Sequence, residues 1–358
     1  MQNNAIVYCE GLFGESDGKV ANGLVRFSEK YKILGIIDST KAGLDAGEYL
    51  DGVKNYIPIY KDIQDALVNI KEAPKYFIIG AALAESYIPD NFMKAIKEAM
   101  TAGMSIVNGL PIYLTDNDSL NNLALESEVA IYDIRKPKPV TELKLFSGAI
   151  EKVTCPVVAV LGLDCAIGKR TTCMELVNSL KAQGLKAAFV ATGQTGILQG
   201  AKYGVPIDVI NSQYVVGEIE ASVVEAFETE NPDIILIEGQ SSVSHEAYLS
   251  SYGIIKGGRP DAFILQYAPK RKQRVDFEFI DVPTTKSEIE LIEFLSKKPV
   301  IALTINHENM LPTEVASEIK KAELKHKLPV EDVLLNSPKK ITNTIIKTFN
   351  LNKKLSAV

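Results

Sequence analysis

The sequence predicts an α/β protein of two domains, each built on a mostly parallel sheet with flanking helices. Short runs of β-branched residues alternate with longer amphipathic stretches along the whole chain, which is the pattern of repeated βαβ units. The length of 358 residues favours two domains over one. A basic, proline-rich stretch at 135–139 separates one series of such units from the next.

Composition and charge exclude several classes of protein. The chain is 46% hydrophobic and 23% charged, which is ordinary globular composition. With 39 Lys and Arg against 45 Asp and Glu, the net charge is −6, the wrong sign for neutralising many phosphates, so we expect no nucleic-acid partner. The start has no signal-peptide pattern, and no apolar run reaches the roughly 18 residues needed to cross a bilayer. We therefore expect a cytoplasmic protein without a membrane partner.

The first domain, at 1–134, is predicted to be Rossmann-like. Strands are expected at 5–9, 32–38, 76–80 and 105–108, and helices at 18–31, 63–70 and 90–102, bounded by Gly, Pro or Asp. Gly11, Gly14 and Asp38 show some likeness to a dinucleotide site, but their spacing is not G-x-G-x-x-G. A structural role for this domain is therefore favoured over NAD binding.

A linker is expected at 135–152, because prolines there disfavour helices and central strands. The second domain, at 153–358, begins with an almost wholly apolar strand at 156–161, as expected for a strand covered on both faces. Further strands are predicted at 187–191, 233–238, 261–266 and 300–304, and helices at 170–183, 216–229, 286–297 and 313–324.

A glycine-rich loop joins the apolar strand at 156–161 to a long helix. Strand, loop, Gly-Lys and helix together form the context that a phosphate-binding P-loop requires. Backbone N–H groups of the loop and of the first helical turn converge on one point, where Lys169 adds a positive charge. The sequence therefore predicts a P-loop NTPase-like domain that binds a pyrophosphate-containing cofactor. The predicted contacts are Gly162, Asp164, Cys165, Ala166, Ile167, Gly168, Lys169, Arg170, Thr171 and Thr172.

The loop departs from the G-x4-G-K-[ST] pattern. Its first glycine lies one residue further away, and Arg170 stands where Ser or Thr is expected. In P-loop NTPases that hydroxyl holds Mg²⁺, so its absence disfavours metal-dependent hydrolysis. Arg170 offers a bidentate phosphate donor instead. If Mg²⁺ is used, Glu238 and Thr171 are the predicted ligands, with Thr172 as an alternative to Thr171.

Three residues are candidates for catalysis. Ligands of open α/β sheets bind at the carboxyl ends of strands, so Glu238, the last residue of an apolar strand, is expected to face the P-loop. It is predicted to accept a proton or to ligate a metal ion. His245, seven residues later, is the alternative base, and its other interpretation is a loop histidine with a local hydrogen bond. The candidate oxyanion donors are the Gly239-Gln240 backbone and Gln194, although the Gln194 loop at 191–196 is also explained as a plain turn.

Five residues are predicted to contact the substrate. Thr192 and Gly193 lie in the loop at 191–196, and Gln240 follows Glu238 closely. Arg271 and Arg259 are the candidate clamps for a carboxylate. The basic run at 270–272 is equally explained as a solvated charged face.

Taken together, these motifs resemble the D-glutamate N-acetyltransferase-like family. The loop at 162–172 is similar to that family's Gly-Thr-Asp-Cys-Ala-Val-Gly-Lys-x-Thr-Thr sequence, and the segments at 191–196 and 238–240 match other signatures. The resemblance covers both domains. Departures are Leu163 in place of threonine, Pro111 in place of histidine, and Gln213-Tyr214 in place of Asp-Phe. It implies an acetyl-CoA-dependent N-acetyltransferase that acts on D-glutamate or a related amino acid.

The second domain is also similar to dethiobiotin synthetase. That resemblance implies ATP with Mg²⁺ as the alternative cofactor, and a ligase or kinase reaction as the alternative activity. A non-catalytic nucleotide-binding protein is a third hypothesis. The expected partner is a small-molecule amino-acid substrate. The sequence leaves the oligomeric state open, with a homo-oligomer as one alternative.

Overall fold

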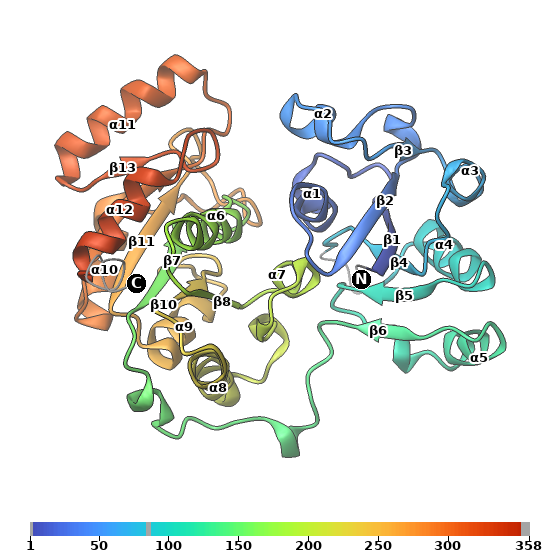
Figure 1. Ribbon diagram of the computed structural model, residues 1–358, viewed down its shortest axis with the longest axis horizontal. Coiled ribbons are helices and arrows are strands. Elements are labelled where there is room, and N and C mark those ends of the chain that lie inside the picture. The colour runs from blue at the N-terminus through green and yellow to red at the C-terminus, as the bar shows by residue number, and fades with distance from the viewer. Residues whose placement is uncertain (1–2, 84–86, 352–358) are drawn as a thin grey trace. The chain divides into compact units, whose positions relative to one another are not determined.

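The computed structural model describes residues 3–83 and 87–351 (Figure 1). The chain divides into two compact units, which are Met1–Pro137 with Gln194–Gly200, and Lys138–Gly193 with Ala201–Val358. Each unit has its own parallel sheet and flanking helices, which confirms the predicted α/β class. Segment Gln194–Gly200 groups with the first unit, whereas the sequence places it inside the second predicted domain.

The first unit contains a six-stranded parallel sheet in the order β3-β2-β1-β4-β5-β6. Its strands are β1 (Asn3–Tyr8), β2 (Tyr31–Ile37), β3 (Ile59–Tyr60), β4 (Tyr76–Ile79), β5 (Ser105–Asn108) and β6 (Ile131–Asp133). The order runs outward from β1 in both directions, as in a Rossmann-like sheet. The short strands β3 and β6 are additional to the predicted ones.

Helices cover both faces of this first sheet. They are α1 (Lys19–Arg26), α2 (Ala46–Asp51), α3 (Ile63–Asn69), α4 (Asp90–Thr101), α5 (Asp118–Glu126) and α7 (Gln194–Gln199). Along β1, Ile6 and Tyr8 belong to one buried cluster, and Ala5 and Val7 to another. This period of two places alternate side chains on opposite faces, which explains why the buried part of the strand, Ala5 to Tyr8, has apolar side chains on both faces.

The second unit contains a seven-stranded parallel sheet in the order β13-β12-β11-β7-β10-β8-β9. Its strands are β7 (Val157–Gly162), β8 (Ala187–Ala191), β9 (Tyr203–Gly204), β10 (Ile234–Glu238), β11 (Ala262–Tyr267), β12 (Val300–Ile305) and β13 (Val330–Glu331). The central strand β7 pairs with β10 on one side and β11 on the other. The residues that follow these three strands therefore share one edge of the sheet.

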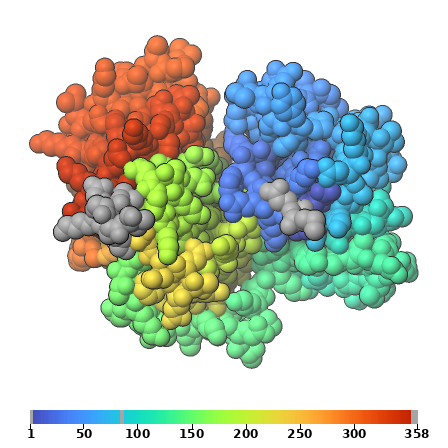
Figure 2. Space-filling view, in the orientation of Figure 1, coloured from blue at the N-terminus to red at the C-terminus, as the bar shows by residue number. Residues whose placement is uncertain are grey.

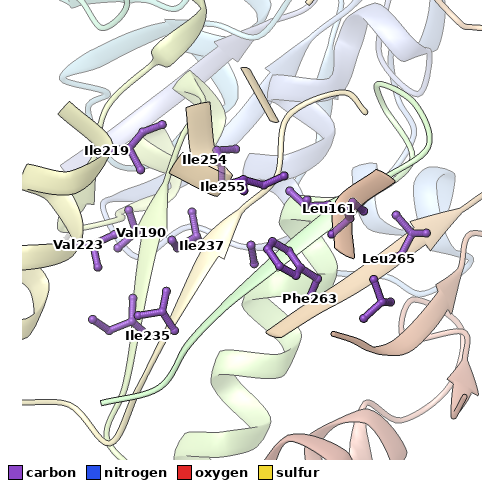
Figure 3. Packing of buried hydrophobic residues seen from close by; sticks show 14 of the residues in the cluster. Leu161, Val190, Ile219, Val223, Ile235, Ile237, Ile254, Ile255, Phe263 and Leu265 are labelled. Atoms are coloured by element: carbon purple, nitrogen blue, oxygen red, sulfur yellow. The ribbon is translucent and has the colours of Figure 1, made fainter. Parts of the chain in front are cut away.

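Two buried clusters also cover the faces of the second sheet. The helices are α6 (Lys169–Ala182), α8 (Ser212–Glu230), α9 (Ser250–Gly258), α10 (Thr285–Ser296), α11 (Pro312–His326) and α12 (Lys339–Thr348). On one face, Leu161 and Phe263 pack with Ile219 of α8 and Ile254 of α9 (Figure 3). The other face is covered by α6 and α12, which lie side by side in the space-filling view (Figure 2).

Short 3₁₀ turns complete the two units. They are Ser16–Gly18, Ser39–Lys41, Leu114–Asp116, Val140–Glu142, Ala149–Lys152 and Ile207–Val209. Among the described residues, no helix combines the length and apolar character that crossing a bilayer requires.

The predicted linker is bonded to helix α8 of the second unit. A buried acid, Glu220, accepts hydrogen bonds from the backbone N–H groups of Ser147 at 2.7 Å and Ile150 at 3.2 Å. A Cβ atom on Gly217 would lie 2.2 Å from the carbonyl oxygen of Lys144, so only glycine allows this close approach. The segment is thus a strap held by α8.

We expect Glu220→Ala to lower the free energy of unfolding by about 2 kcal/mol, because it leaves buried N–H groups without their acceptor. Burial by itself would raise the pKa of Glu220, but the strap's donors hold it below its ordinary value. The stabilisation is therefore present at neutral pH and is lost as the pH falls through that pKa. Urea denaturation measures the change. The exposed Glu225→Ala on the same helix is the control, and equal effects of the two variants would contradict the strap's role.

Candidate functional site

The P-loop connects β7 to α6 at the carboxyl edge of the second sheet. Gly168 precedes the helix with φ of +90°, a left-handed conformation that favours glycine. The helix starts at once, since the backbone N–H of Thr172 donates to the carbonyl oxygen of Gly168 at 2.9 Å. The first turn of α6 thus presents its N–H groups at the end of the central strand, as an anion site requires.

Lys169 is 6% exposed, and its ammonium group donates to the backbone carbonyl oxygen of Asp164 in the same loop. Burial lowers the pKa of Lys169, while nearby Cys165, Asp164 and Glu238 act in the opposite direction. A hydrogen bond from a buried ammonium group to an anion is stronger than one to a neutral carbonyl oxygen. The geometry therefore suits a phosphate between the lysine and the helix start.

The side chain of Asp164 anchors the P-loop to the segment after β11. Its Oδ2 accepts from Arg271 at 2.9 Å and from the backbone N–H of Val275 at 3.0 Å. Arg271 also donates to the carbonyl oxygen of Cys165 at 2.7 Å and to Glu308. The structure therefore brings Arg271 to the P-loop, where its guanidinium group shapes the loop itself.

Two residues that the sequence analysis missed support the loop from neighbouring strands. Gln266 in β11 and Asn306 after β12 both donate to the carbonyl oxygen of Ile167, at 2.6 and 3.0 Å. The signal was available, because a polar residue at the end of an apolar strand is the same feature that singled out Glu238. The loop that follows β7 is therefore held by residues in β11 and directly after β12.

Glu238 is 5% exposed and lies beside the P-loop at the end of β10. Its Oε2 accepts from the backbone N–H groups of Thr192 at 3.0 Å and Gly193 at 3.3 Å, and Gln240 donates to the Thr192 hydroxyl at 3.2 Å. Burial raises the pKa of Glu238, while Arg170, these backbone donors and Lys169 oppose the shift. The structure brings these predicted residues into one cluster around a buried carboxyl group.

The positive charge near Glu238 disfavours the predicted metal site. The positive charge of Arg170 acts on Glu238 directly, so a cation held by Glu238 would meet a like charge. Thr171 is half-buried, and Thr172 is fully buried with no hydrogen-bond partner for its hydroxyl among the described residues. Within the described ranges, no group of three or more His, Cys, Asp or Glu side chains could hold a metal ion.

His245 lies in a second cluster next to the P-loop. Arg274, which is 1% exposed, donates to the carbonyl oxygen of Leu163 and to the Ser242 hydroxyl, both at 3.0 Å. It thereby connects the P-loop to the loop that carries His245. Burial raises the pKa of the Cys165 thiol in this region, so Cys165 is a thiol and not a thiolate.

The structure does not bring Arg259 to the P-loop. It precedes β11, whose residue Gln266 pairs with Gly162 near the carboxyl end of β7. Arg259 therefore lies at the opposite edge of the sheet, where it pairs with Glu151. The structure thus places Arg259 away from the P-loop, and its predicted role as a carboxylate clamp stays a prediction.

Gln194 groups with the first unit. It starts α7, whose Gln199 donates to the carbonyl oxygens of Gly23 at 2.7 Å and Phe27 at 3.0 Å at the end of α1. The P-loop cluster described above is built without Gln194. Its predicted role as an oxyanion donor stays a prediction.

Asp38 of the first unit is fully buried and bonded to its own loops. It accepts from the backbone N–H groups of Phe13 and Thr40, each at 3.0 Å, and from the Thr40 hydroxyl at 2.6 Å. Burial alone would raise the pKa of Asp38, but these donors hold it below its ordinary value. The carboxylate thus stabilises the loop after β1, in agreement with the structural role that its sequence context favours.

Known family models match both units of the chain. A domain of unknown function described as the DUF1611 P-loop domain matches residues 144–342, more than half of the chain, and the DUF1611 Rossmann-like domain matches residues 39–137. The chain belongs to the DUF1611 family. A crystal structure of a DUF1611 family protein from Anabaena variabilis is 28% identical and has a TM-score of 0.88, over 97% of this chain and 100% of that one.

Two relatives connect this DUF1611 chain to a named activity. A protein from a Pseudoalteromonas species, named D-glutamate N-acetyltransferase, is 33% identical over 222 residues, which are 62% of this chain and 64% of that protein. A protein of the same name from Tritonibacter scottomollicae is 28% identical over 72% of this chain and 77% of its own length. These names confirm the resemblance that the motifs indicate.

We expect Glu238→Gln to raise the free energy of unfolding at pH 8 by about 1 kcal/mol, a usual gain when a strained functional group is relieved. The pKa of Glu238 is raised in the folded state, so wild-type stability falls as the pH rises from the ordinary value of 4.5 through the folded pKa. The amide removes this penalty and still accepts from Thr192.

Thermal or urea melts at pH 5 and pH 8 measure this difference, with Glu225→Gln as the exposed control. A loss of stability at pH 8, or a gain equal at both pH values, would contradict a buried carboxyl group with a raised pKa.

Proposed function

We propose that this DUF1611 protein is an acetyl-CoA-dependent N-acetyltransferase whose acceptor is D-glutamate or a related amino acid. The names of the two relatives support the reaction and the acceptor. The P-loop supports a donor that carries phosphates. The observation that carries the choice of donor is Arg170, which follows the P-loop lysine and whose charge acts on the buried carboxyl group of Glu238.

The residues of the P-loop suit the pyrophosphate of coenzyme A. The first turn of α6 offers N–H groups, and the Lys169 ammonium donates to a neutral loop carbonyl. The buried hydroxyl of Thr172, which has no hydrogen-bond partner within the described part of the chain, lies three residues along the same helix face. An anion held by these groups gains charge-assisted hydrogen bonds and needs no metal ion.

Arg170 favours a phosphate that is bound over one that is transferred. Phosphoryl transfer by P-loop proteins uses a hydroxyl at this position to hold Mg²⁺. Here an arginine takes the position, and its charge acts on Glu238, the other predicted metal ligand. The arrangement therefore supports CoA as the occupant and makes ATP with Mg²⁺ the alternative to test.

Acetyl-CoA would supply a thioester, whose carbon–sulfur bond breaks as the acceptor nitrogen bonds to the acetyl carbon. The chain has to take one proton from the acceptor ammonium before transfer, and the proton released as the amide forms goes to the departing sulfur, so that CoA leaves as the free thiol. We infer that Glu238 is the proton acceptor, because it is buried at the end of β10 beside the P-loop and burial raises its pKa. The backbone N–H groups of Thr192 and Gly193 orient this carboxyl group. The Thr192 hydroxyl donates to the backbone carbonyl oxygen of Glu238 and accepts from Gln240.

Purified protein with acetyl-CoA is expected to release free thiol when D-glutamate is added, measured against a panel of D- and L-amino acids. No release above background with any amino acid would sink the proposal. Calorimetry with ATP then tests the alternative. A protein that binds ATP only with Mg²⁺, loses that binding in EDTA and does not bind CoA would favour the ligase or kinase reaction. CoA binding that is unaffected by EDTA supports the proposed function.

We expect Lys169→Ala to weaken CoA binding at least 100-fold, about 3 kcal/mol, because a buried cation facing an anion is lost. The melting temperature should change little, since the lysine holds only a loop carbonyl. Calorimetry and circular dichroism measure the two effects. Lys181→Ala, an exposed residue on the same helix, is the control and should bind CoA like the wild type. Unchanged affinity in Lys169→Ala would contradict a phosphate in the loop.

A further inference from the structure

The imidazole of His245 is enclosed by aromatic rings in the loop that follows β10. The residue is 5% exposed. Its ring centroid lies 4.5 Å from that of Tyr248 and 5.7 Å from that of Phe277. Contacts with two rings restrict rotation of the imidazole. Its two nitrogen atoms therefore keep defined directions.

The hydrogen bonding of His245 identifies its tautomer. The backbone N–H of Ala247 donates to Nδ1 at 3.1 Å. Because that N–H can only donate, Nδ1 carries the lone pair, and the proton of the neutral ring is on Nε2. Nε2 is buried and has no hydrogen-bond partner among the described residues. An unsatisfied buried donor costs about 1–3 kcal/mol, and a ligand acceptor would offset that cost.

The surroundings also keep the ring neutral. Burial lowers the pKa of His245 most, and the guanidinium group of Arg274 lowers it further. The carboxylates of Asp164, Glu246 and Asp276 raise the pKa of His245, but its net shift is still downward. The charged and titratable groups around the ring are Asp164 from the P-loop, Glu246 and Tyr248 from its own loop, and Arg274 and Asp276 from the segment after β11.

The loop that carries His245 is fixed from two sides. Glu288 on α10 is fully buried and accepts from the backbone N–H groups of Val243 at 2.6 Å and Ser244 at 3.3 Å. On the other side, Arg274 bonds the same loop and the P-loop at once. A donor held this rigidly loses little to reorganisation when charge develops on a ligand oxygen.

We propose that His245 donates a hydrogen bond through Nε2–H to an oxygen atom of the bound acyl donor or acceptor, and does not take the proton of the acceptor amine. Nε2 already carries a proton, and the lone pair of Nδ1 is occupied by the Ala247 N–H. The inference rests on the proposed function and leaves Glu238 as the proton acceptor. Two ligand oxygens have the required chemistry, the thioester carbonyl and a carboxylate of the amino acid.

Two variants separate a donor from a base. His245→Gln places an amide N–H donor near the position of Nε2, and His245→Phe keeps an aromatic ring without any donor. We expect the rate of acetyl transfer to fall by about 10²–10³-fold in His245→Phe, as for loss of one oxyanion donor, and by less than about tenfold in His245→Gln. Melting curves show whether both variants fold.

The kinetic constants identify the oxygen. A loss confined to kcat assigns the donor to the thioester carbonyl, and a rise confined to the KM of the amino acid assigns it to a carboxylate. The ascending limb of the pH–rate profile should persist in His245→Gln, because Glu238 sets it. Equal losses in the two folded variants together with loss of that limb would overturn the proposal and make His245 the base.

Nitrogen-15 NMR of the wild-type protein tests the tautomer without any turnover. We expect a protonated Nε2 and an unprotonated Nδ1 in the ring of His245 at pH 7, and the reverse assignment or a doubly protonated ring would overturn the proposal. If the wild type transfers no acetyl group, the proposed function fails separately. Calorimetry with acetyl-CoA and with D-glutamate then tests the donor: weaker binding of either ligand to His245→Phe than to His245→Gln supports it, and equal binding of both ligands to the two variants contradicts it.

Discussion

The guanidinium group of Arg274 determines the relative positions of the two loops that form the candidate site. Arg274 is among the largest fully buried side chains of the described residues, with 1% of its surface exposed. It donates to the carbonyl oxygen of Leu163 in the P-loop and to the Ser242 hydroxyl in the neighbouring loop. Its Nε also donates to Glu246 at 3.0 Å. A buried cation is tolerated only when such partners replace its hydration, since desolvation costs several kcal/mol. The phosphate loop and the His245 loop are therefore one structural element held around a single charge.

The distribution of charge explains where an acidic chain binds an anion. The net charge is −6, yet four cations gather at one edge of the second sheet: Lys169, Arg170, Arg271 and Arg274. Arg271 and Arg274 face carboxylates of the protein, so they are largely neutralised within the fold. Lys169 instead donates to a neutral carbonyl oxygen. The positive charge available to a ligand is concentrated at the first turn of α6.

Most of the fold could be predicted from the sequence, because apolar runs such as β7 are typical of buried parallel strands. The two-residue strands β3, β9 and β13 could not, since two residues show no periodicity. The role of Arg274 could not be predicted either, because the sequence around it gives no sign that it is buried. Its partner Leu163 is 111 residues away in the sequence. The position of Arg259 was predictable and was overlooked, because a residue that precedes a parallel strand lies at the opposite edge from the P-loop.

Glu238 has to satisfy two opposed requirements in the proposed transfer. Burial raises its pKa, which a proton acceptor for an amine needs, but an unpaired buried carboxylate would destabilise the fold. Arg170 and the Thr192 N–H hold the charged form without bonding a metal ion to it. A Mg²⁺ ion on Glu238 would stabilise the carboxylate so strongly that it could not accept a proton at neutral pH. The same carboxyl group can therefore serve as a metal ligand or as a base, but not as both, and under the proposed function an arginine after the P-loop lysine favours the base.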